Sequence, residues 1–400
     1  MTMTSNLIVI GDHQQNTIDQ MEKCLKSGGV KGVLCADGHK GYAQPVGGVI
    51  AYKDRISISG VGFDIACGNK AVKLDIKGSD IEPEQWTKIA DDLAANLSFG
   101  VGRPNKDVAE HELFEDDPAW DIKEVGALKQ LAKNQLGSIG SGNHYSDVFV
   151  DENDNVWVGV HFGSRGLGHK IATHFLDIAG GKDGMDVPPC IVDTDSTIGK
   201  EYIAAMKLAG RYAYAGRDWV VDKIAKILGG KILDEIHNHH NFAWEEEHNG
   251  ENLWVVRKGS TPAFPGQRGF VGGSMGGRSV ILHGVDSPPA KLALYSTVHG
   301  AGRVMSRTEA AGKVKWQKDE NGKKRPVRVS EGKFNEKEMR KSISVLGIEL
   351  RGGGADEAPA VYRNLEDVLE SHKNSIKIET WLTPKIVVMA GADTFDPYKD

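Results

Sequence analysis

A histidine surrounded by glycines is the most suggestive group for catalysis in this sequence. His299 lies in the segment Val298–Arg307 (VHGAGRVMSR), and Arg303 follows it by four residues. The glycines would let the backbone approach a ligand beside the imidazole, and a planar guanidinium suits a phosphate or a carboxylate. Glycine-flanked histidines also occur in ordinary turns. The segment therefore predicts a catalytic site only if other reactive groups converge on it.

A carboxylate and a thiol occur close together in a second glycine-rich segment. Asp64 and Cys67 are separated by two residues, within the stretch 60–68 (GVGFDIACG). A carboxylate beside a thiolate suits Mn²⁺, Zn²⁺ or Fe²⁺, with the thiolate as the softer ligand. The alternative is a buried structural cysteine near a capping aspartate.

Two histidines flank a pair of apolar segments that alternate as strands do. His144 precedes the segment 145–150, His161 ends the segment 156–161, and the turn 152–155 separates them. An antiparallel hairpin would bring both imidazoles to the same end, where they could bind one metal ion. Two hydrogen-bonded core histidines are the alternative.

A histidine cluster and a glycine-rich loop are the next candidates. In an extended chain, only some histidines of the cluster 237–241 (HNHHN) would lie on one face, so one of them could join a metal site. A solvated turn is the alternative. The loop 272–279 (GGSMGGRS) offers N–H groups and hydroxyls to a base or a phosphate, but it lacks the Gly-Lys-Ser/Thr ending of a Walker loop. A plain turn explains it equally well.

Composition limits the classes of partner. The 400 residues carry a net charge of −6, so a nucleic acid would need a local basic patch. The strongest basic run is 313–328 (KVKWQKDENGKKRPVR), which could contact phosphates or form a solvated hairpin or helix pair. We expect no membrane partner, because no apolar run reaches spanning length. The residues 1–6 show no secretory pattern, and four scattered cysteines predict reduced thiols in the cytoplasm.

The elements that must position these groups alternate between strands and helices. Hydrophobic patterns predict strands that include 7–10, 30–34, 47–52, 71–76 and 385–389, and helices that include 18–27, 83–97, 122–135 and 200–228. Glycine-rich turns recur from position 28 to 302, without a repeat or a linker. The sequence therefore predicts one large domain over residues 1–400.

Taken in order, these motifs resemble the RtcB family of RNA ligases. The resemblance runs from about Ala36 to Gly391 and covers these segments: 37–39 (DGH), 64–68 (DIACG), 140–144 (GSGNH), 161–166 (HFGSRG), 240–241 (HN), 257–259 (RKG), 273–276 (GSMG), 299–303 (HGAGR) and 356–359 (DEAP) with Tyr362. It implies the α/β fold of that family, with packed mixed β-sheets at the centre, helices outside and a metal site in a cleft.

The resemblance also implies an activity. Such ligases join RNA 3′-phosphate or 2′,3′-cyclic phosphate ends to 5′-hydroxyl ends, using GTP and two Mn²⁺ ions. His299 matches the histidine that attacks the α-phosphate of GTP and becomes guanylylated. Asp37 matches an acidic residue near the reacting 5′-end, a candidate for activating that hydroxyl. Positions matching the metal ligands are Asp64, Cys67, His144, His161 and His240. Those matching the nucleotide site are Asn143 and Arg303 at the phosphate, and Ser274, Ser279 and Tyr362 at the guanine.

This chain departs from the family pattern where the base is expected. Asp147 stands where the family usually has a glutamate that reads the Watson–Crick edge of guanine, and Ala390 stands where it usually has a lysine. An unusual tail, 392–400, follows, and Lys385 or Lys399 could replace the missing lysine. The departures predict weakened or changed nucleotide specificity.

Three functions therefore follow from the resemblance and its departures. The first is a cytoplasmic ligase for RNA repair or tRNA splicing, with an activating protein as a further candidate partner. The second is a metal-dependent phosphoesterase or nucleotidyltransferase of the same fold. The third is a non-catalytic RNA-binding partner, which would not need the complete ligand set together with His299.

Overall fold

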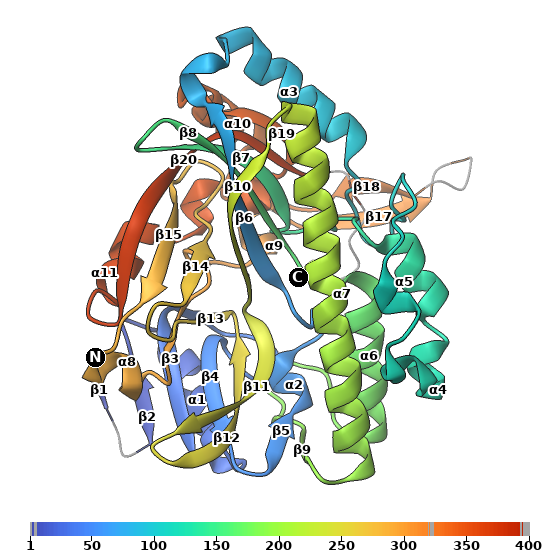
Figure 1. The fold of residues 1–400 in the computed structure, drawn as a ribbon, viewed down its shortest axis with the longest axis vertical. Helices are drawn as coiled ribbons and strands as arrows, with labels where there is room; N and C mark the ends of the chain where they lie inside the picture. The colour runs from blue at the N-terminus through green and yellow to red at the C-terminus, as the bar shows by residue number, and fades with distance from the viewer. Residues whose placement is uncertain (1, 4–5, 319, 321–323, 393, 395–400) are drawn as a thin grey trace.

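Two β-sheets form the centre of the structure, a computed structural model that describes all residues except 1, 4–5, 319, 321–323, 393 and 395–400. The six-stranded sheet occupies the lower half of Figure 1, and the eight-stranded sheet occupies the upper half. In order, the first sheet contains β1 (Thr2–Met3), β2 (Leu7–Val9), β3 (Lys31–His39), β4 (Val46–Tyr52), β12 (Glu251–Lys258) and β11 (Asn241–His248).

The larger sheet positions four of the predicted ligands, since His161 lies in one of its strands and Cys67, His144 and His240 each adjoin another. Its order is β10 (Ile232–His239), β6 (Gly68–Lys77), β8 (Asn155–Phe162), β7 (Tyr145–Asp151), β20 (Ile376–Gly391), β15 (Ser279–Gly284) and β14 (Arg268–Val271), with β19 (Glu349–Gly353) beside β20. The pairs β2–β3 and β19–β20 are parallel, whereas β6–β8 and β7–β8 are antiparallel. Mixed sheets with helices outside confirm the predicted α/β class.

Short strands and helices surround the two sheets. The short strands are β5 (Arg55–Ser57), β9 (Ile191–Asp193), β13 (Ser260–Pro262), β16 (Ser296–Val298), β17 (Val314–Lys318) and β18 (Lys324–Arg328). The α-helices are α1 (Gln15–Lys26), α2 (Ile58–Val61), α3 (Pro83–Asn96), α4 (Lys123–Gly126), α5 (Lys129–Gln135), α6 (Arg165–Ile178), α7 (Thr197–Leu228), α8 (Pro288–Leu292), α9 (Arg307–Ala311), α10 (Glu336–Val345) and α11 (Leu365–Glu370). In the part of the chain described, no helix is both long and apolar enough to cross a membrane.

The longest helix, α7, packs along the larger sheet (Figure 1). It begins where the Ser196 side chain accepts a hydrogen bond from the N–H of Gly199, and it ends at Gly229, whose φ of 73° only glycine adopts cheaply. Val220 and Ile224 on this helix join one hydrophobic core with the strand residue Val158. Burial of this apolar face fixes α7 against the strands that carry the site.

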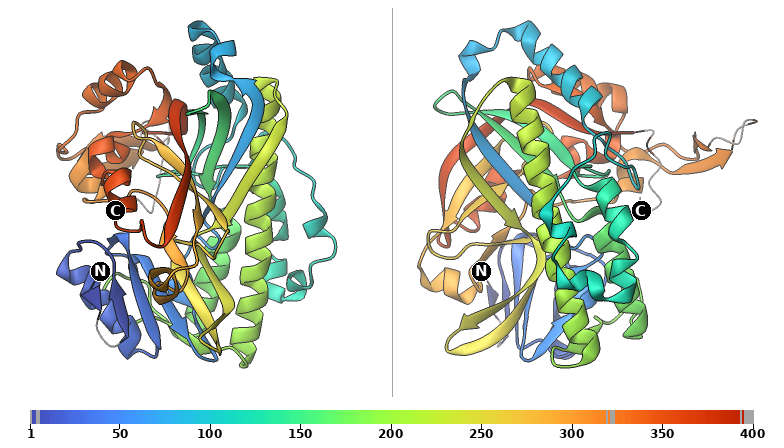
Figure 2. Two further views of the ribbon diagram at one scale, coloured as in Figure 1. Left: turned by 60° about the vertical axis from the view of Figure 1, so that its left-hand side comes forward. Right: turned by 45° about the vertical axis from the view of Figure 1, so that its right-hand side comes forward.

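Two predicted regions differ from the structure, and a third takes one of the forms expected for it. The helix expected over 122–135 is broken into α4 and α5, which is consistent with the low helix propensity of Gly126. Strands β10 and β11 lie where the sequence indicated only a histidine cluster, because their polar residues hide the apolar alternation. The basic run 313–328 forms the hairpin β17–β18, which projects from the body in the right-hand view of Figure 2. Its contact with RNA stays a prediction.

Candidate active site

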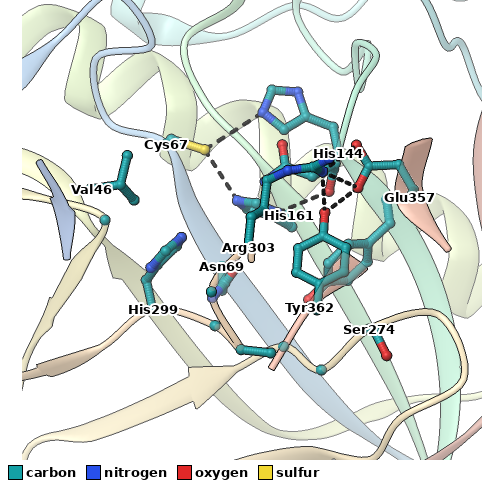
Figure 3. Close-up of a pocket in the computed structure, with 18 of the residues that line it drawn as sticks. Val46, Cys67, Asn69, His144, His161, Ser274, His299, Arg303, Glu357 and Tyr362 are labelled. Atoms are coloured by element: carbon teal, nitrogen blue, oxygen red, sulfur yellow. Dashed lines mark hydrogen bonds and ion pairs between the residues drawn. The ribbon is translucent and has the colours of Figure 1, made fainter. Parts of the chain in front are cut away.

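A cavity of about 330 Å³ gathers residues from both sheets and from the glycine-rich loops. Of the residues selected from the sequence, those lining it are Asp64, Cys67, Asn143, His144, Asp147, His161, His240, Ser274, His299, Arg303 and Tyr362. Figure 3 shows several of these side chains directed into one space. Segments separated by more than 200 residues therefore converge, as the catalytic hypothesis requires.

Five candidate metal ligands form two overlapping groups in this cavity. One contains Cys67, His161 and His240, the other contains Asp64, Cys67 and His144, and each group's ligand atoms lie within 4.8 Å of one another. The Cys67 Sγ is 3.2 Å from His161 Nε2 and 3.6 Å from His144 Nε2 (Figure 3). Because both groups share Cys67, its sulfur could bridge two cations.

The β7–β8 hairpin brings two of these histidines together. Tyr145 lies opposite His161 in the antiparallel register, so His144 falls just beyond the paired end. The His144 and His161 ring centroids are 5.3 Å apart. The predicted hairpin and the proximity of its two histidines are thus confirmed.

The surroundings of the histidines direct one ring nitrogen of each toward the other proposed ligands. Burial lowers the pKa of His161 and of His240 well below the usual value. The Nδ1 of His161 is 3.1 Å from the carbonyl oxygen of Asn143, and that of His144 is 3.0 Å from that of Ile139. Each Nδ1–H donates to its carbonyl, which directs the Nε2 of each ring at the other ligands; the Nε2 of His144 is 3.0 Å from Asp64 Oδ2.

A divalent cation fits this set of donors. His161 Nε2 and His240 Nε2 are only 3.3 Å apart, and the Nδ1 of His240 is buried without a hydrogen-bond partner. Burial, followed by the charge of Asp64, raises the pKa of the Cys67 thiol well above its usual value. A bound cation would reverse that shift and deprotonate the thiol. Imidazole, thiolate and carboxylate together suit Mn²⁺, Zn²⁺ or Fe²⁺.

His299 is held from behind by an aspartate. Asp37 Oδ2 accepts hydrogen bonds from the His299 backbone N–H at 3.0 Å and from its Nδ1–H at 2.6 Å. Burial raises the pKa of Asp37, but the charge and hydrogen bonds of His299 outweigh burial and hold it below its usual value. The ionised carboxylate therefore orients the ring with Nε2 as the free nitrogen.

The glycine neighbours of His299 permit this arrangement. Gly302 has a φ of 78°, and a Cβ added to it would lie 2.4 Å from the carbonyl oxygen of Asp37. Asp37 itself has no exposed surface and does not line the cavity. The structure thus places Asp37 beneath the histidine. A residue that activates a substrate hydroxyl would instead be expected at the cavity surface.

The sequence matches a family of known activity. The profile of the family described as tRNA-splicing ligase RtcB matches residues 20–133 and 123–390. An RNA-splicing ligase RtcB from Escherichia coli K12 is 29% identical, over 86% of both chains. A tRNA-splicing ligase RtcB from Thermococcus kodakarensis is 30% identical, over 89% of this chain and 87% of its own length. A tRNA-splicing ligase RtcB from Archaeoglobus fulgidus is 30% identical, over 85% of this chain and 83% of its own length. The chain belongs to the RtcB family.

Two residues of this RtcB-family chain line the cavity but were given no role from the sequence. Glu357 and Arg307 line the cavity beside Arg303 and Tyr362. The Arg303 Nη1 donates to Glu357 at 3.3 Å and to the Tyr362 hydroxyl at 3.0 Å, and its guanidinium stacks over the Tyr362 ring. Arg307 is paired with Glu357 and Asp356. The sequence signals for this network were the segment 298–307, which ends in Arg307, and the motif 356–359, which contains Glu357.

At the predicted base-binding end, this RtcB-family chain has a buried carboxyl that is only partly hydrogen-bonded. Asp147 lines the cavity, one of its oxygens has no hydrogen-bond partner, and burial raises its pKa well above the usual value. Ser274 also lines the cavity. Ser279 does not, because its Oγ faces inward and accepts a hydrogen bond from the N–H of Gly273 at 3.0 Å.

The missing family lysine is not restored at its own position, although another lysine, Lys258, lines the cavity and donates from Nζ to the carbonyl oxygen of Tyr42. Ala390 lies in a small neighbouring hollow, together with Arg307 and Gly391. Lys385 is not part of the cavity lining. Lys399, the other candidate, lies outside the described residues.

Proposed function

We propose that this chain is an RNA ligase that joins 3′-phosphate or 2′,3′-cyclic phosphate ends of RNA to 5′-hydroxyl ends, using GTP and Mn²⁺. Its setting would be the cytoplasm, in RNA repair or tRNA splicing. The proposal is carried by one observation, the convergence of an aspartate-oriented histidine with two ligand groups that share Cys67 in one cavity. Membership of the RtcB family supports the same chemistry.

The five clustered side chains would hold two metal ions. Asp64, Cys67 and His144 would bind one, and Cys67, His161 and His240 the other. When bound, Mn²⁺ would neutralise phosphate charge and help to align in-line displacement. The Nδ1–H groups of His161 and His144 donate to backbone carbonyls, which orients both rings before an ion arrives.

His299 is the proposed nucleophile. Its Nε2 would attack the α-phosphate of GTP, forming an N–P bond and releasing pyrophosphate. Asp37 would stabilise the positive charge that develops on the ring, as an acidic partner does for histidine elsewhere. GMP would then pass to the RNA 3′-phosphate, and the 5′-hydroxyl would displace it. Asn143 and Arg303 would hold the nucleotide phosphates, with Tyr362 packed beneath the Arg303 guanidinium.

The preference of this chain for GTP over other NTPs should be weaker than that of a site with the usual family glutamate. Guanine presents two donors on its Watson–Crick edge, which an ionised carboxylate accepts well, whereas burial favours the neutral form of Asp147. We expect adduct formation from GTP to exceed that from the other NTPs by less than about tenfold, and Asp147→Glu to raise this preference by about tenfold. Labelling with each of four α-labelled NTPs measures it. Asp151→Glu, at the far end of β7, is the control, and a strict GTP preference in the wild type would refute the prediction.

One experiment tests the proposed function against its rivals. The protein is incubated with Mn²⁺ and α-labelled GTP, as wild type and as His299→Ala, and RNA with a 3′-phosphate and a 5′-hydroxyl is then added. We expect labelled wild type, unlabelled variant and sealed RNA. Hydrolysis of the RNA end without protein label would instead indicate a phosphoesterase. RNA binding without chemistry would indicate a binding module.

A further inference from the structure

A fully buried arginine lies behind the group formed by Cys67, His161 and His240. Arg217 extends from α7, has no exposed surface and does not line the cavity. A guanidinium removed from water needs hydrogen-bond acceptors for its five N–H groups, and a carboxylate is the usual choice. None of the hydrogen bonds that the structure gives to Arg217 goes to a carboxylate. Its placement therefore calls for another explanation.

The acceptors of Arg217 adjoin the proposed ligands in the chain. Nη1 donates to the carbonyl oxygens of Ala66 at 3.0 Å and of Phe162 at 2.5 Å, and Nη2 donates to His239 Nδ1 at 2.9 Å. Ala66 precedes Cys67, Phe162 follows His161, and His239 precedes His240. One guanidinium thus binds three chain segments, two through backbone carbonyls and one through the His239 ring, and each segment carries one member of the same ligand group.

The remaining contacts hold the guanidinium itself in place. Its Nε donates to His237 Nε2 at 2.8 Å, and the other nitrogen of that ring is 3.3 Å from Asp218. The Tyr214 ring lies 5.3 Å from the guanidinium carbon and stacks on His239 with centroids 3.9 Å apart. Because the arginine can only donate, both histidines present lone pairs to it. His237 and His239 therefore support the Arg217 guanidinium. Of the three clustered histidines, only His240 lines the cavity.

One of the bound segments has a conformation that needs such support. Ala66 has a φ of 60°, in the left-handed region that non-glycine residues seldom adopt. Its N–H donates to the carbonyl of Asn241, and its carbonyl accepts from Arg217. The peptide groups on both sides of Ala66 are thus fixed by hydrogen bonds, and this determines where the Cys67 sulfur points.

We propose that Arg217 is a positioning residue for the metal group, whose planar fork of donors sets the mutual geometry of Cys67, His161 and His240. This inference rests on the metal site in the proposed function. A lysine would keep the charge but cannot bind three separate segments at fixed angles. Arg217→Lys should therefore weaken metal binding even in a folded protein.

The test compares two buried arginines in the full-length protein. Arg257 is also fully buried, but it pairs with Glu246 and donates to Ser296 and to the carbonyl of Leu294, none of which adjoins a proposed ligand. Mn²⁺ affinity is measured by the electron paramagnetic resonance signal of free Mn²⁺, and folding by the thermal midpoint of the metal-free protein. We expect Arg217→Lys to lose about 10–100-fold in Mn²⁺ affinity. Arg257→Lys should lower the midpoint without such a loss.

The outcomes separate the two proposals. Unchanged Mn²⁺ affinity in folded Arg217→Lys, or equal losses in both variants, would overturn the positioning role. If the wild type binds no Mn²⁺, the proposed function itself fails. Absorption spectra of the Co²⁺-substituted protein, which respond to ligand geometry, should change in Arg217→Lys and stay unchanged in Arg257→Lys.

A milder variant covers the case in which Arg217→Lys does not fold. His237→Leu removes one acceptor of the guanidinium on the side away from the ligands. We expect a smaller but measurable loss of Mn²⁺ affinity. Wild-type affinity in the folded His237→Leu protein would count against the proposal.

Discussion

Replacing Asp37 with asparagine is expected to slow the proposed guanylylation of His299 by about 10³–10⁴-fold, as loss of the acidic partner does in Ser-His-Asp enzymes. Asp37 Oδ2 now accepts two hydrogen bonds from the same histidine. An asparagine can turn its NH₂ group toward Nδ1 and stabilise the other tautomer, in which Nε2 carries the proton and cannot attack. Because asparagine and aspartate have nearly the same shape, the slower guanylylation would reflect the changed tautomer of His299.

Single-turnover labelling with α-labelled GTP and Mn²⁺ measures this effect. Asp151→Asn is a matched control, because Asp151 is a buried carboxylate that accepts hydrogen bonds from Asn153, Asn155 and Trp157 at the distant end of the β7–β8 hairpin. It should lose stability but label at the wild-type rate. Labelling of Asp37→Asn within tenfold of wild type would show that the carboxylate does not direct the ring.

The second large effect is expected from Cys67→Ala. Cys67 is the only residue common to both ligand groups found among the described residues, so one substitution removes a donor from each. We expect Mn²⁺ affinity to fall by at least about 100-fold, beyond the usual loss for residues that only support ligands. We expect the Cys67→Ala protein to bind fewer Mn²⁺ ions per chain than the two proposed for the wild type.

Equilibrium dialysis against Mn²⁺ gives both affinity and stoichiometry. Cys24→Ala is the control, since Cys24 is a buried thiol in the hydrophobic core and lies near the carbonyl of Ala43. That variant should bind Mn²⁺ like the wild type. If Cys67→Ala retains two ions at wild-type affinity, the shared-sulfur arrangement is wrong.

Predictability from sequence differed between elements for physical reasons. The long helix α7 was placed to within a few residues because its apolar face repeats over many turns and a glycine ends it. The His144–His161 pair followed from a short turn, since hairpin pairing is local. The strands β10 and β11 were missed because they are rich in His, Asn and Glu and gain their burial from neighbouring strands distant in sequence.

The amino-acid sequence alone supplies the list of reactive groups and, through their order, identifies the RtcB family. How these groups work together follows only from the folded chain. Among the clustered histidines, His240 faces the cavity because its N–H binds the carbonyl of Cys67, while His237 and His239 turn toward Arg217. Asp37 reaches His299 from 262 positions away in the chain. Such contacts depend on which strands pair and which side chains are buried together, and neither is encoded in local spacing.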